Sequence, residues 1–461
     1  MFLNLDQKNQ ENIAAIDDNN GRITYGELNE FSENFYNKIG SRTLIFIISK
    51  NSIGAMAGYI AALTARVVPL MLGYKIDRQL LENLISIYKP EYIWLPDNYN
   101  FKDSYKSIYS DLGYCLIKTS SLIAELNPDL SLLLPTSGST GSPKLVRHSY
   151  RNVEQNAANV SSLFNLNKDQ KAIAILPIHY TMGLSVVTSH LYAGATVLLC
   201  NQNLTDKEFW SFIKNNKATS LTGVPYSYEV LDRIRFFRMD LPDLQIISQG
   251  GGKMRSELFQ SCADYALKTN RMFIATYGQT EGTARMAYLP PEMAQTKNCS
   301  IGKAIPGGKL YLVDDELNEI KDQEVSGQLV YEGPNVTLGY ASDINDLTKG
   351  DDNGGILYTG DIAHRDIDGY YYIDGRINRF LKLYGNRISL DESEHLIRSK
   401  FNIDCICEGD DQVMKVIITK DDLKEKVLDF LMQKTNLFQD ALEINVVDKI
   451  LRSEVGKPIY L

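Results

Sequence analysis

The sequence of 461 residues has little that would tie the protein to a membrane or to nucleic acid. Its longest apolar stretch, 55–72, is interrupted by Arg66 and Pro69, so we expect no membrane span. No basic segment leads into an apolar core at the N-terminus, which argues against a secretory signal. The formal net charge is −9, whereas a protein that binds duplex nucleic acid usually presents a basic face. These absences predict a cytoplasmic protein that does not bind nucleic acid.

Two common catalytic patterns and a metal-binding cysteine pattern are also missing. The sequence has no Gly-x-Ser-x-Gly elbow and no persuasive Ser-His-Asp set, so a side-chain nucleophile is not indicated. The six cysteines are scattered, and only Cys405 and Cys407 lie close together, without the second pair that a zinc ribbon needs. We therefore expect reduced, structural cysteines rather than a metal site.

A polar loop at 136–144, Thr-Ser-Gly-Ser-Thr-Gly-Ser-Pro-Lys, stands out from the rest of the sequence. Small residues let the backbone curl so that its N–H groups point to one spot, and the hydroxyls and the lysine add donors and charge, which suits a polyphosphate. The loop is not a Walker A motif, because no Gly-Lys-Ser/Thr closes it and Pro143 has no N–H. Alone, it fits a phosphate loop and an exposed turn equally well. Its candidate nucleotide-binding residues are Thr136, Ser137, Gly138, Ser139, Thr140, Gly141 and Lys144.

The length and the hydrophobic pattern predict two domains that differ in secondary structure. A chain of 461 residues exceeds what one core usually supports. Apolar strands such as 44–48 alternate with helical stretches such as the Gly/Ala-rich 54–65, a pattern typical of a layered α/β fold. Toward the C-terminus the elements are short and α+β in pattern, with a hairpin expected around 384–386. We predict a large N-terminal domain of layered α/β sheets, 1–377, and a small α+β C-terminal domain, 378–461.

Four further motifs follow the loop in order and at wide spacings. They are Tyr277-Gly278-Gln279-Thr280-Glu281, Tyr358-Thr359-Gly360-Asp361, Gly375-Arg376 and Gly456-Lys457. Together with the loop, they resemble the acyl-adenylate-forming superfamily of AMP-dependent synthetases and ligases. That superfamily includes acyl-CoA synthetases, peptide-synthetase adenylation domains and firefly luciferase. The resemblance covers nearly the whole chain and implies that the small domain is a mobile lid.

The resemblance implies an enzyme that activates a carboxylic acid with ATP. The acid would attack the α-phosphate, pyrophosphate would leave, and the acyl group would pass to the pantetheine thiol of CoA or of an acyl carrier protein. Both partners of the first step are anionic, so the protein must mainly position them and neutralise charge. We therefore expect Mg²⁺ on the phosphates.

The resemblance assigns the metal and the α-phosphate to three residues. Glu281 would hold the metal with help from Thr140, and Thr280 would bond the α-phosphate. Alone, Glu281 would more often be a solvated loop charge. Within its motif, after a strand at 272–276, the functional interpretation is preferred.

Nucleoside binding is assigned to the same motif and to two later residues. Tyr277 would stack on adenine, and Gly278 and Gln279 belong to the same nucleotide-binding motif. Asp361 would accept hydrogen bonds from the ribose hydroxyls, a task that suits a fixed carboxylate. Arg376 would add a second contact to the ribose. The alternative for Asp361 is an ordinary turn aspartate.

The acyl pocket is assigned to two further features. A glycine-rich turn follows the strand that ends near 247, where a backbone without side chains lets a ligand approach. Its residues are Gly250, Gly251 and Gly252. His179 would border the acyl pocket as a catalytic-site residue. The alternatives are a flexible turn and a structural histidine.

Two residues near the C-terminus are assigned to the two half-reactions. Lys457 would bridge the substrate carboxylate and the α-phosphate, cancelling charge on both. Gly385, in the expected hairpin, would line the tunnel for the pantetheine thiol. The alternatives are a solvated terminal lysine and a plain hairpin glycine.

Some positions depart from the family pattern, and three rival functions remain: an amino-acid-activating enzyme, an oxygen-using luciferase and a non-catalytic nucleotide-binding module. Leu145 stands where a glycine is usual, the hinge residue is Asn378 instead of aspartate or lysine, and Phe380 replaces a glutamine. The closest rival is the enzyme that activates an amino acid such as D-alanine and loads a carrier protein. Such enzymes place an aspartate just after the position of His179 to bind the ammonium, and 179–185 contains no acid. We therefore favour an acid without an α-amine.

Overall fold

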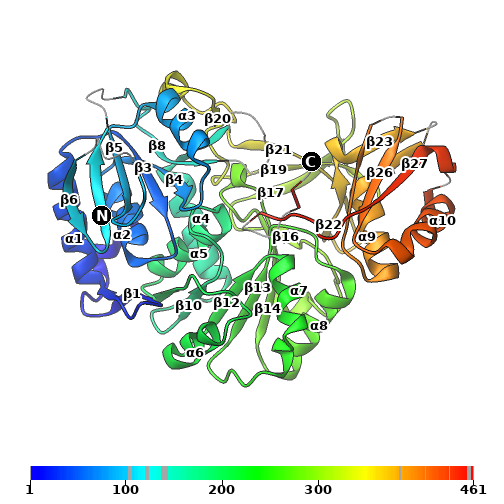
Figure 1. Cartoon of the computed structure of the whole chain (residues 1–461), viewed down its shortest axis with the longest axis horizontal. Helices are drawn as coiled ribbons and strands as arrows, with labels where there is room; N and C mark the ends of the chain where they lie inside the picture. Colours follow the sequence, from blue (N-terminus) through cyan, green and yellow to red (C-terminus); the bar gives the residue numbers. More distant parts are fainter. Residues whose placement is uncertain are drawn as a thin grey trace.

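The computed structural model describes residues 2–101, 106–119, 124–135, 144–383, 386–410, 412–435, 437–453 and 458–459. Among these residues, three large sheets build the large N-terminal domain, and a hairpin and a three-stranded sheet build the small C-terminal domain. Figure 1 shows the small domain, in orange and red, beside the large one. None of the helices described is both long and apolar enough to cross a membrane.

The nine-stranded sheet has the strand order β16-β15-β14-β13-β12-β10-β11-β1-β2. Its strands pair in parallel from β1 to β14 and antiparallel at both edges. Helices α6, α7 and α8 pack on one face through an apolar cluster that includes Phe209, Tyr228 and Phe259. The strands are β1 Ile13–Asp17, β2 Arg22–Thr24, β10 Lys171–Ala174, β11 Thr196–Leu199, β12 Ser220–Gly223, β13 Ile246–Gln249, β14 Met272–Tyr277, β15 Ala287–Leu289 and β16 Lys303–Ala304, and the helices are α6 Lys207–Asn216, α7 Pro225–Arg233 and α8 Ser256–Lys268.

The eight-stranded sheet lies across a helical layer from the first and has the order β20-β9-β8-β4-β3-β5-β7-β6. Helices α1, α2, α4 and α5 fill the layer between the two sheets, and their side chains share one apolar core with both sheets. Helix α3 packs on the opposite face. The strands are β3 Leu44–Ser49, β4 Val68–Gly73, β5 Tyr92–Pro96, β6 Ser107–Asp111, β7 Tyr114–Lys118, β8 Leu130–Pro135, β9 Leu145–Ser149 and β20 Tyr340–Ala341, and the helices are α1 Tyr25–Ile39, α2 Ile53–Thr64, α3 Arg78–Tyr88, α4 Tyr150–Leu163 and α5 Thr181–Tyr192.

The Gly/Ala-rich stretch of the sequence forms α2, which packs directly on the eight-stranded sheet. A Cβ on Gly58 would lie 2.4 Å from the Trp94 ring, so only glycine lets the helix come this close. The Trp94 indole N–H donates to the Gly54 carbonyl at 2.8 Å, which ties the helix to β5. The apolar stretch 55–72 is thus divided between α2 and β4, with Arg66 in the turn between them.

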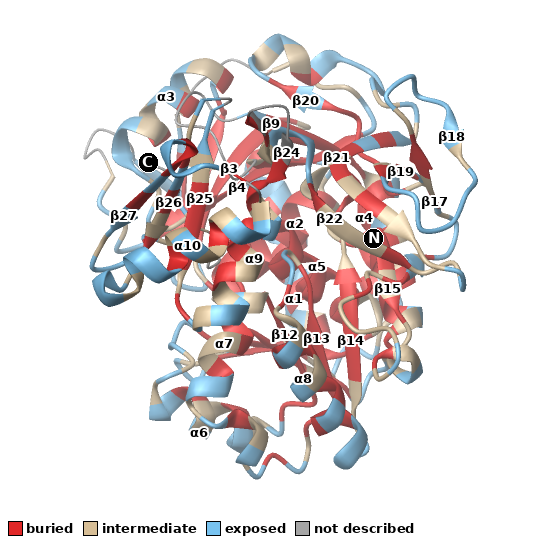
Figure 2. Cartoon of the chain, turned by 90° about the vertical axis from the view of Figure 1, so that its right-hand side faces the viewer, coloured by how far each residue is buried: buried red, intermediate tan, exposed pale blue. Residues whose placement is uncertain are grey.

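A five-stranded antiparallel sheet completes the large domain, in the order β18-β17-β19-β21-β22. Figure 2 shows β19 largely buried and β21 with buried and more exposed residues in alternation, whereas β17 and β18 border exposed loops. The short turn η6 Ile377–Arg379 follows β22 and contains the predicted domain boundary. The strands are β17 Lys309–Val313, β18 Glu319–Ile320, β19 Gly327–Glu332, β21 Ile356–Arg365 and β22 Tyr371–Arg376, and the turn η3 Thr280–Gly282 lies after β14.

The small domain is α+β, as the sequence predicts. The expected hairpin is present, because β23 and β24 pair antiparallel with Leu383 opposite Asn386. Helices α9 and α10 pack with the three-stranded sheet β25-β26-β27 around a separate apolar core. The elements are β23 Phe380–Leu383, β24 Asn386–Ser389, α9 Leu390–Phe401, β25 Cys405–Gly409, β26 Met414–Ile418, α10 Lys424–Thr435 and β27 Leu442–Val446.

Candidate active site

The motif residues of the large domain meet at one edge of the nine-stranded sheet. There β13 leads into the Gly250–252 turn, and β14 ends at Tyr277 and leads into η3. In open α/β sheets, the carboxyl ends of parallel strands form the binding crevice, so this edge is where a ligand is expected. Strand β21 of the five-stranded sheet brings Asp361 to the same place.

Asp361 is the centre of a buried hydrogen-bonded cluster and is only 3% exposed. The Tyr277 hydroxyl donates to its Oδ2 at 2.5 Å, and Gln279 Nε2 donates to the same oxygen at 2.9 Å. Arg376 is the direct partner of Asp361 across β21 and β22, and its Nε lies 3.0 Å from Oδ1. Asp361 is therefore in contact with three other residues that were predicted to bind the nucleotide.

The surroundings of Asp361 hold its carboxylate in place and keep its neighbour protonated. Burial raises the pKa of Asp361 above its usual value, while the charge of Arg376 and the hydrogen bonds from Tyr277 and Gln279 act in the opposite direction. Burial and the Asp361 carboxylate both raise the pKa of the Tyr277 hydroxyl, so it remains a donor at neutral pH. The ribose role of Asp361 and the adenine role of Tyr277 stay predictions.

Tyr340 connects the end of the polar loop to the predicted metal ligand. Its hydroxyl donates to Glu281 Oε1 at 2.8 Å, and Lys144 Nζ lies 5.4 Å from the centre of its ring. The neighbouring Thr280 accepts a hydrogen bond at 2.9 Å from the hydroxyl of Thr181, the first residue of α5. Thr280 and Glu281 are thereby held from two different elements.

Glu281 fits a magnesium ion that arrives with a nucleotide better than a resident metal. Mg²⁺ is usually held by one or two carboxylates together with substrate phosphates, and Glu281 can supply such a carboxylate. Across the described residues, no three His, Cys, Asp or Glu side chains gather closely enough to hold a metal by themselves. All six cysteines are free thiols, as the sequence predicts.

Arg147, which the sequence analysis missed, fixes the position of Tyr340. It lies on β9, is fully buried, and donates to the carbonyl oxygens of Leu338 at 2.7 Å and of Tyr340 at 3.0 Å. It also donates to the carbonyl of Lys349 at 2.6 Å and to the carboxylate of Asp352 at 2.5 Å. This guanidinium therefore holds the segment that carries Tyr340 against the strand that leaves the polar loop.

The glycine-rich turn packs against the start of α5, beside His179. A Cβ on Gly251, whose φ is +79°, would lie 2.7 Å from the Tyr180 hydroxyl, and one on Gly250 would lie 2.6 Å from Thr276 Oγ1. The imidazole of His179 packs over Gly73 at the end of β4. The turn therefore contacts Tyr180, the residue that follows His179, and the roles of the turn and of His179 at an acyl pocket stay predictions.

Several predicted site residues lie outside the residues that the structure describes. They are Thr136, Ser137, Gly138, Ser139, Thr140, Gly141, Gly385 and Lys457. Of the predicted polar loop, the structure describes Lys144 alone. Thr181, Tyr340 and Arg147 were not predicted, because each stands outside any recognisable motif and is placed only by the tertiary fold.

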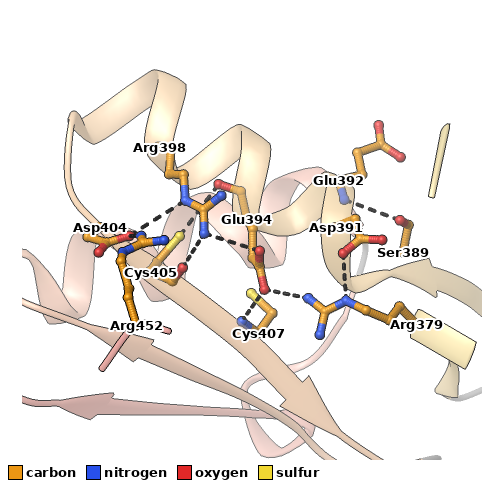
Figure 3. Close-up of polar contacts among 10 residues, drawn as sticks. All are labelled: Arg379, Ser389, Asp391, Glu392, Glu394, Arg398, Asp404, Cys405, Cys407 and Arg452. Carbon is orange, nitrogen blue, oxygen red and sulfur yellow. Dashed lines mark hydrogen bonds and ion pairs between the residues drawn. The ribbon is translucent and has the colours of Figure 1, made fainter. Parts of the chain in front are cut away.

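The small domain contains a charged network on α9, shown in Figure 3. Glu394, which is 5% exposed, accepts hydrogen bonds from Arg379 at 2.5 Å and from Arg398 at 3.2 Å. Asp404 accepts a hydrogen bond from Arg452 at 2.6 Å. The Arg452 guanidinium in turn lies 5.0 Å from the centre of the Tyr226 ring on α7 of the large domain. The network thus continues to a contact between the two domains.

Comparison with known proteins identifies the family to which the chain belongs. A family model described as AMP-binding enzyme matches residues 4–341. The chain therefore belongs to the AMP-binding enzyme family. A solved o-succinylbenzoate CoA synthetase from Bacillus subtilis, in complex with an acyl-adenylate intermediate, has the same fold, with a TM-score of 0.80, 19% identity and coverage of 99% of this chain and 96% of that one. That enzyme has also been solved with ATP and a magnesium ion.

Two curated relatives are named as CoA ligases. An indoleacetate–CoA ligase from Aromatoleum aromaticum is 31% identical over 276 residues, which are 59% of this chain and 53% of that protein. The chain thus spans about half the length of that relative. A 2-succinylbenzoate–CoA ligase from Listeria monocytogenes is 24% identical over 452 residues, with coverage of 94% of this chain and 92% of that protein.

Proposed function

We propose that the protein activates a carboxylic acid with ATP, forming an acyl adenylate and releasing pyrophosphate. It then transfers the acyl group from the acyl adenylate to the thiol of CoA. The observation that carries this proposal is the continuous set of polar groups from Asp361, through Tyr277 and Gln279, to Thr280 and Glu281. The two curated CoA ligases above support the acid and CoA as substrates.

Each group in this set has a task in forming an acyl adenylate. Asp361, braced by Arg376, would accept hydrogen bonds from the ribose hydroxyls and so fix the nucleoside. Thr280, oriented by Thr181, would donate to the α-phosphate where charge develops during the displacement. Glu281 would hold a Mg²⁺ ion, which supplies charge neutralisation on the phosphates. The reaction then needs positioning and charge compensation, and no covalent intermediate on the protein.

Asp361→Ala is expected to weaken ATP binding by about 1–3 kcal/mol, the range for losing a charged hydrogen-bond partner. The loss removes both acceptor oxygens and leaves Arg376 without its carboxylate. Isothermal titration with ATP and Mg²⁺ measures the effect directly. Asp374→Ala is the matched control, since this carboxylate on β22 pairs with His364 instead of the site. Equal ATP affinity in folded Asp361→Ala and wild-type protein would remove the ribose assignment.

The acid is expected to lack an α-amine. The stretch 179–185 carries no carboxylate to pair with an ammonium, and an unpaired ammonium in a pocket is costly. ATP–pyrophosphate exchange, measured acid by acid, should therefore be stimulated more by simple carboxylic acids than by amino acids. A clear optimum for one amino acid, such as D-alanine, would favour carrier-protein loading instead. If no acid stimulates ATP–pyrophosphate exchange, the proposed reaction is overturned.

The acceptor thiol is tested separately. With the best acid, CoA should release AMP and form a thioester that is detected by mass spectrometry. Loading of a phosphopantetheinylated carrier protein in place of CoA would identify the alternative acceptor.

A further inference from the structure

Arg285 is a buried cation near the adenylation site for which the described residues supply no carboxylate. Its side chain is 2% exposed. Nη1 donates to the Ser185 hydroxyl at 2.5 Å, and the guanidinium lies 5.4 Å from the centre of the Phe164 ring. Nε has no hydrogen-bond partner within the described structure. Burial lowers the pKa of Arg285 to about 10, so the group is still charged at neutral pH.

The backbone before Arg285 is held in an uncommon conformation that delivers this side chain to the interior. Thr283 and Ala284 both have positive φ, +50° and +72°, which is unfavourable for residues with a Cβ. The Arg285 carbonyl accepts hydrogen bonds from the side-chain amides of Asn156 and Asn335, both at 3.0 Å. Conformations of this kind persist where the surroundings enforce them and are concentrated at functional sites.

The hydroxyl that Arg285 contacts lies about one helical turn along α5 from the residue that contacts Thr280. Ser185, which carries this hydroxyl, follows Thr181 by four residues on α5, a rise of about 6 Å. The Thr181 hydroxyl in turn donates to Thr280. A small cavity of about 20 Å³ lies along the same part of α5 and is lined by Thr181, Ser185 and Thr283, but Arg285 itself does not line it.

The other titratable groups near Arg285 do not neutralise it. Tyr180 interacts electrostatically with the guanidinium, and burial raises the pKa of its hydroxyl, so it is uncharged at neutral pH. Burial lowers the pKa of His190 to about 4, and the charge of Arg285 acts in the same direction, so this imidazole is neutral too. A buried cation without a counter-charge is unfavourable, and an anion from a ligand would relieve that cost.

We propose that Arg285 binds a second anionic group of the acid, so that the substrate is a short dicarboxylic acid. One carboxylate would face Thr280 and the α-phosphate, and the other would pair with the guanidinium about one helical turn away. An arginine fork suits a carboxylate because it offers parallel N–H donors. This inference rests on the proposed adenylation, and it also agrees with the absence of a substrate ammonium.

The test compares acids that match in length and differ in one carboxylate. In ATP–pyrophosphate exchange, the wild type should use succinate over butyrate, or glutarate over valerate, by about 100-fold in kcat/KM, as expected for a charge-assisted pair. Arg285→Met should lose about this factor with the dicarboxylates while its KM for ATP stays within about threefold. Arg285→Lys should keep part of the preference because it keeps the charge. Arg271→Met is the matched control, since Arg271 binds the Leu241 and Leu244 carbonyls at the other end of β14.

The outcomes separate this inference from the proposed function. Wild-type exchange that is as fast with butyrate as with succinate overturns the role of Arg285 and leaves acid activation standing. Failure of every acid overturns the proposed function itself. If Arg285→Met does not fold, the wild type decides alone: in the presence of ATP and Mg²⁺, succinate must raise the melting temperature more than butyrate. Equal shifts with the two acids contradict the inference.

Discussion

Replacing Glu394 with alanine is expected to lower the free energy of unfolding of the small domain by about 3–5 kcal/mol, the cost of removing one partner from a buried ion pair. Glu394 accepts hydrogen bonds from Arg379, Arg398 and the backbone N–H of Cys407. Burial raises the pKa of Glu394, whereas Arg398 and Arg379 oppose the rise and favour the ionised carboxylate. Without it, two partly buried guanidinium groups would face each other without their shared counter-charge.

Helix α9 offers a control for this change. Glu392 is exposed on the same helix, and Figure 3 shows its carboxylate pointing away from the network. Glu392→Ala removes the same atoms and should change stability by less than about 0.5 kcal/mol, as is usual at the surface. Urea denaturation, monitored by hydrogen exchange of the small domain, measures the free energy of unfolding of both variants. Similar losses in the two proteins would show that the network contributes little to stability.

Much of the candidate site could be predicted because its residues stand in short motifs. Tyr277 and Asp361 are 84 residues apart in the sequence, yet both were expected to bind the same nucleotide. The structure brings them into contact. Their mutual hydrogen bond was not predictable, because it depends on how two different sheets meet. Arg376 was predicted near Asp361, and the pairing of β21 with β22 explains why the two are adjacent.

The residues that the sequence did not indicate share one property: their role comes from distant partners. Tyr340 contacts Glu281, which is 59 residues away, and Arg147 contacts carbonyls almost 200 residues further along the chain. Arg285 follows the motif at 277–281 closely and would ordinarily be counted as a solvated charge. Only its burial against Ser185 and Phe164 distinguishes it.

The fold was predictable at the level of layers and less so at the level of strand order. The Gly/Ala-rich stretch was expected to pack closely on a sheet, and the approach of Gly58 to Trp94 confirms this. The hairpin at 384–386 was expected from two short apolar runs, and it is present as β23 and β24. The orders of the nine- and eight-stranded sheets arise from pairings between strands that are distant in sequence, for which local periodicity contains no signal.

Lys457→Ala is expected to slow acyl-adenylate formation by at least about 100-fold, or roughly 3 kcal/mol, the usual effect of removing a key charge-stabilising group. The expectation comes from the family motif, since Lys457 lies outside the described residues. We expect Lys457 to reach the α-phosphate in one orientation of the small domain and Gly385 to meet the thiol in another. The variant should therefore still convert a supplied acyl adenylate and CoA into a thioester.

Two further variants make this prediction specific. Gly385→Leu should show the reverse pattern, forming acyl adenylate but failing in thioester formation, because a bulky side chain would block the tunnel. Lys449→Ala, an exposed lysine earlier in the same C-terminal segment, should affect neither step. Circular dichroism must first establish that each variant is folded, since leucine in place of a glycine can destabilise the small domain. If Lys457→Ala adenylates at the wild-type rate, or if Lys457→Ala and Gly385→Leu lose the same half-reaction, the two steps do not depend on alternate orientations of the small domain.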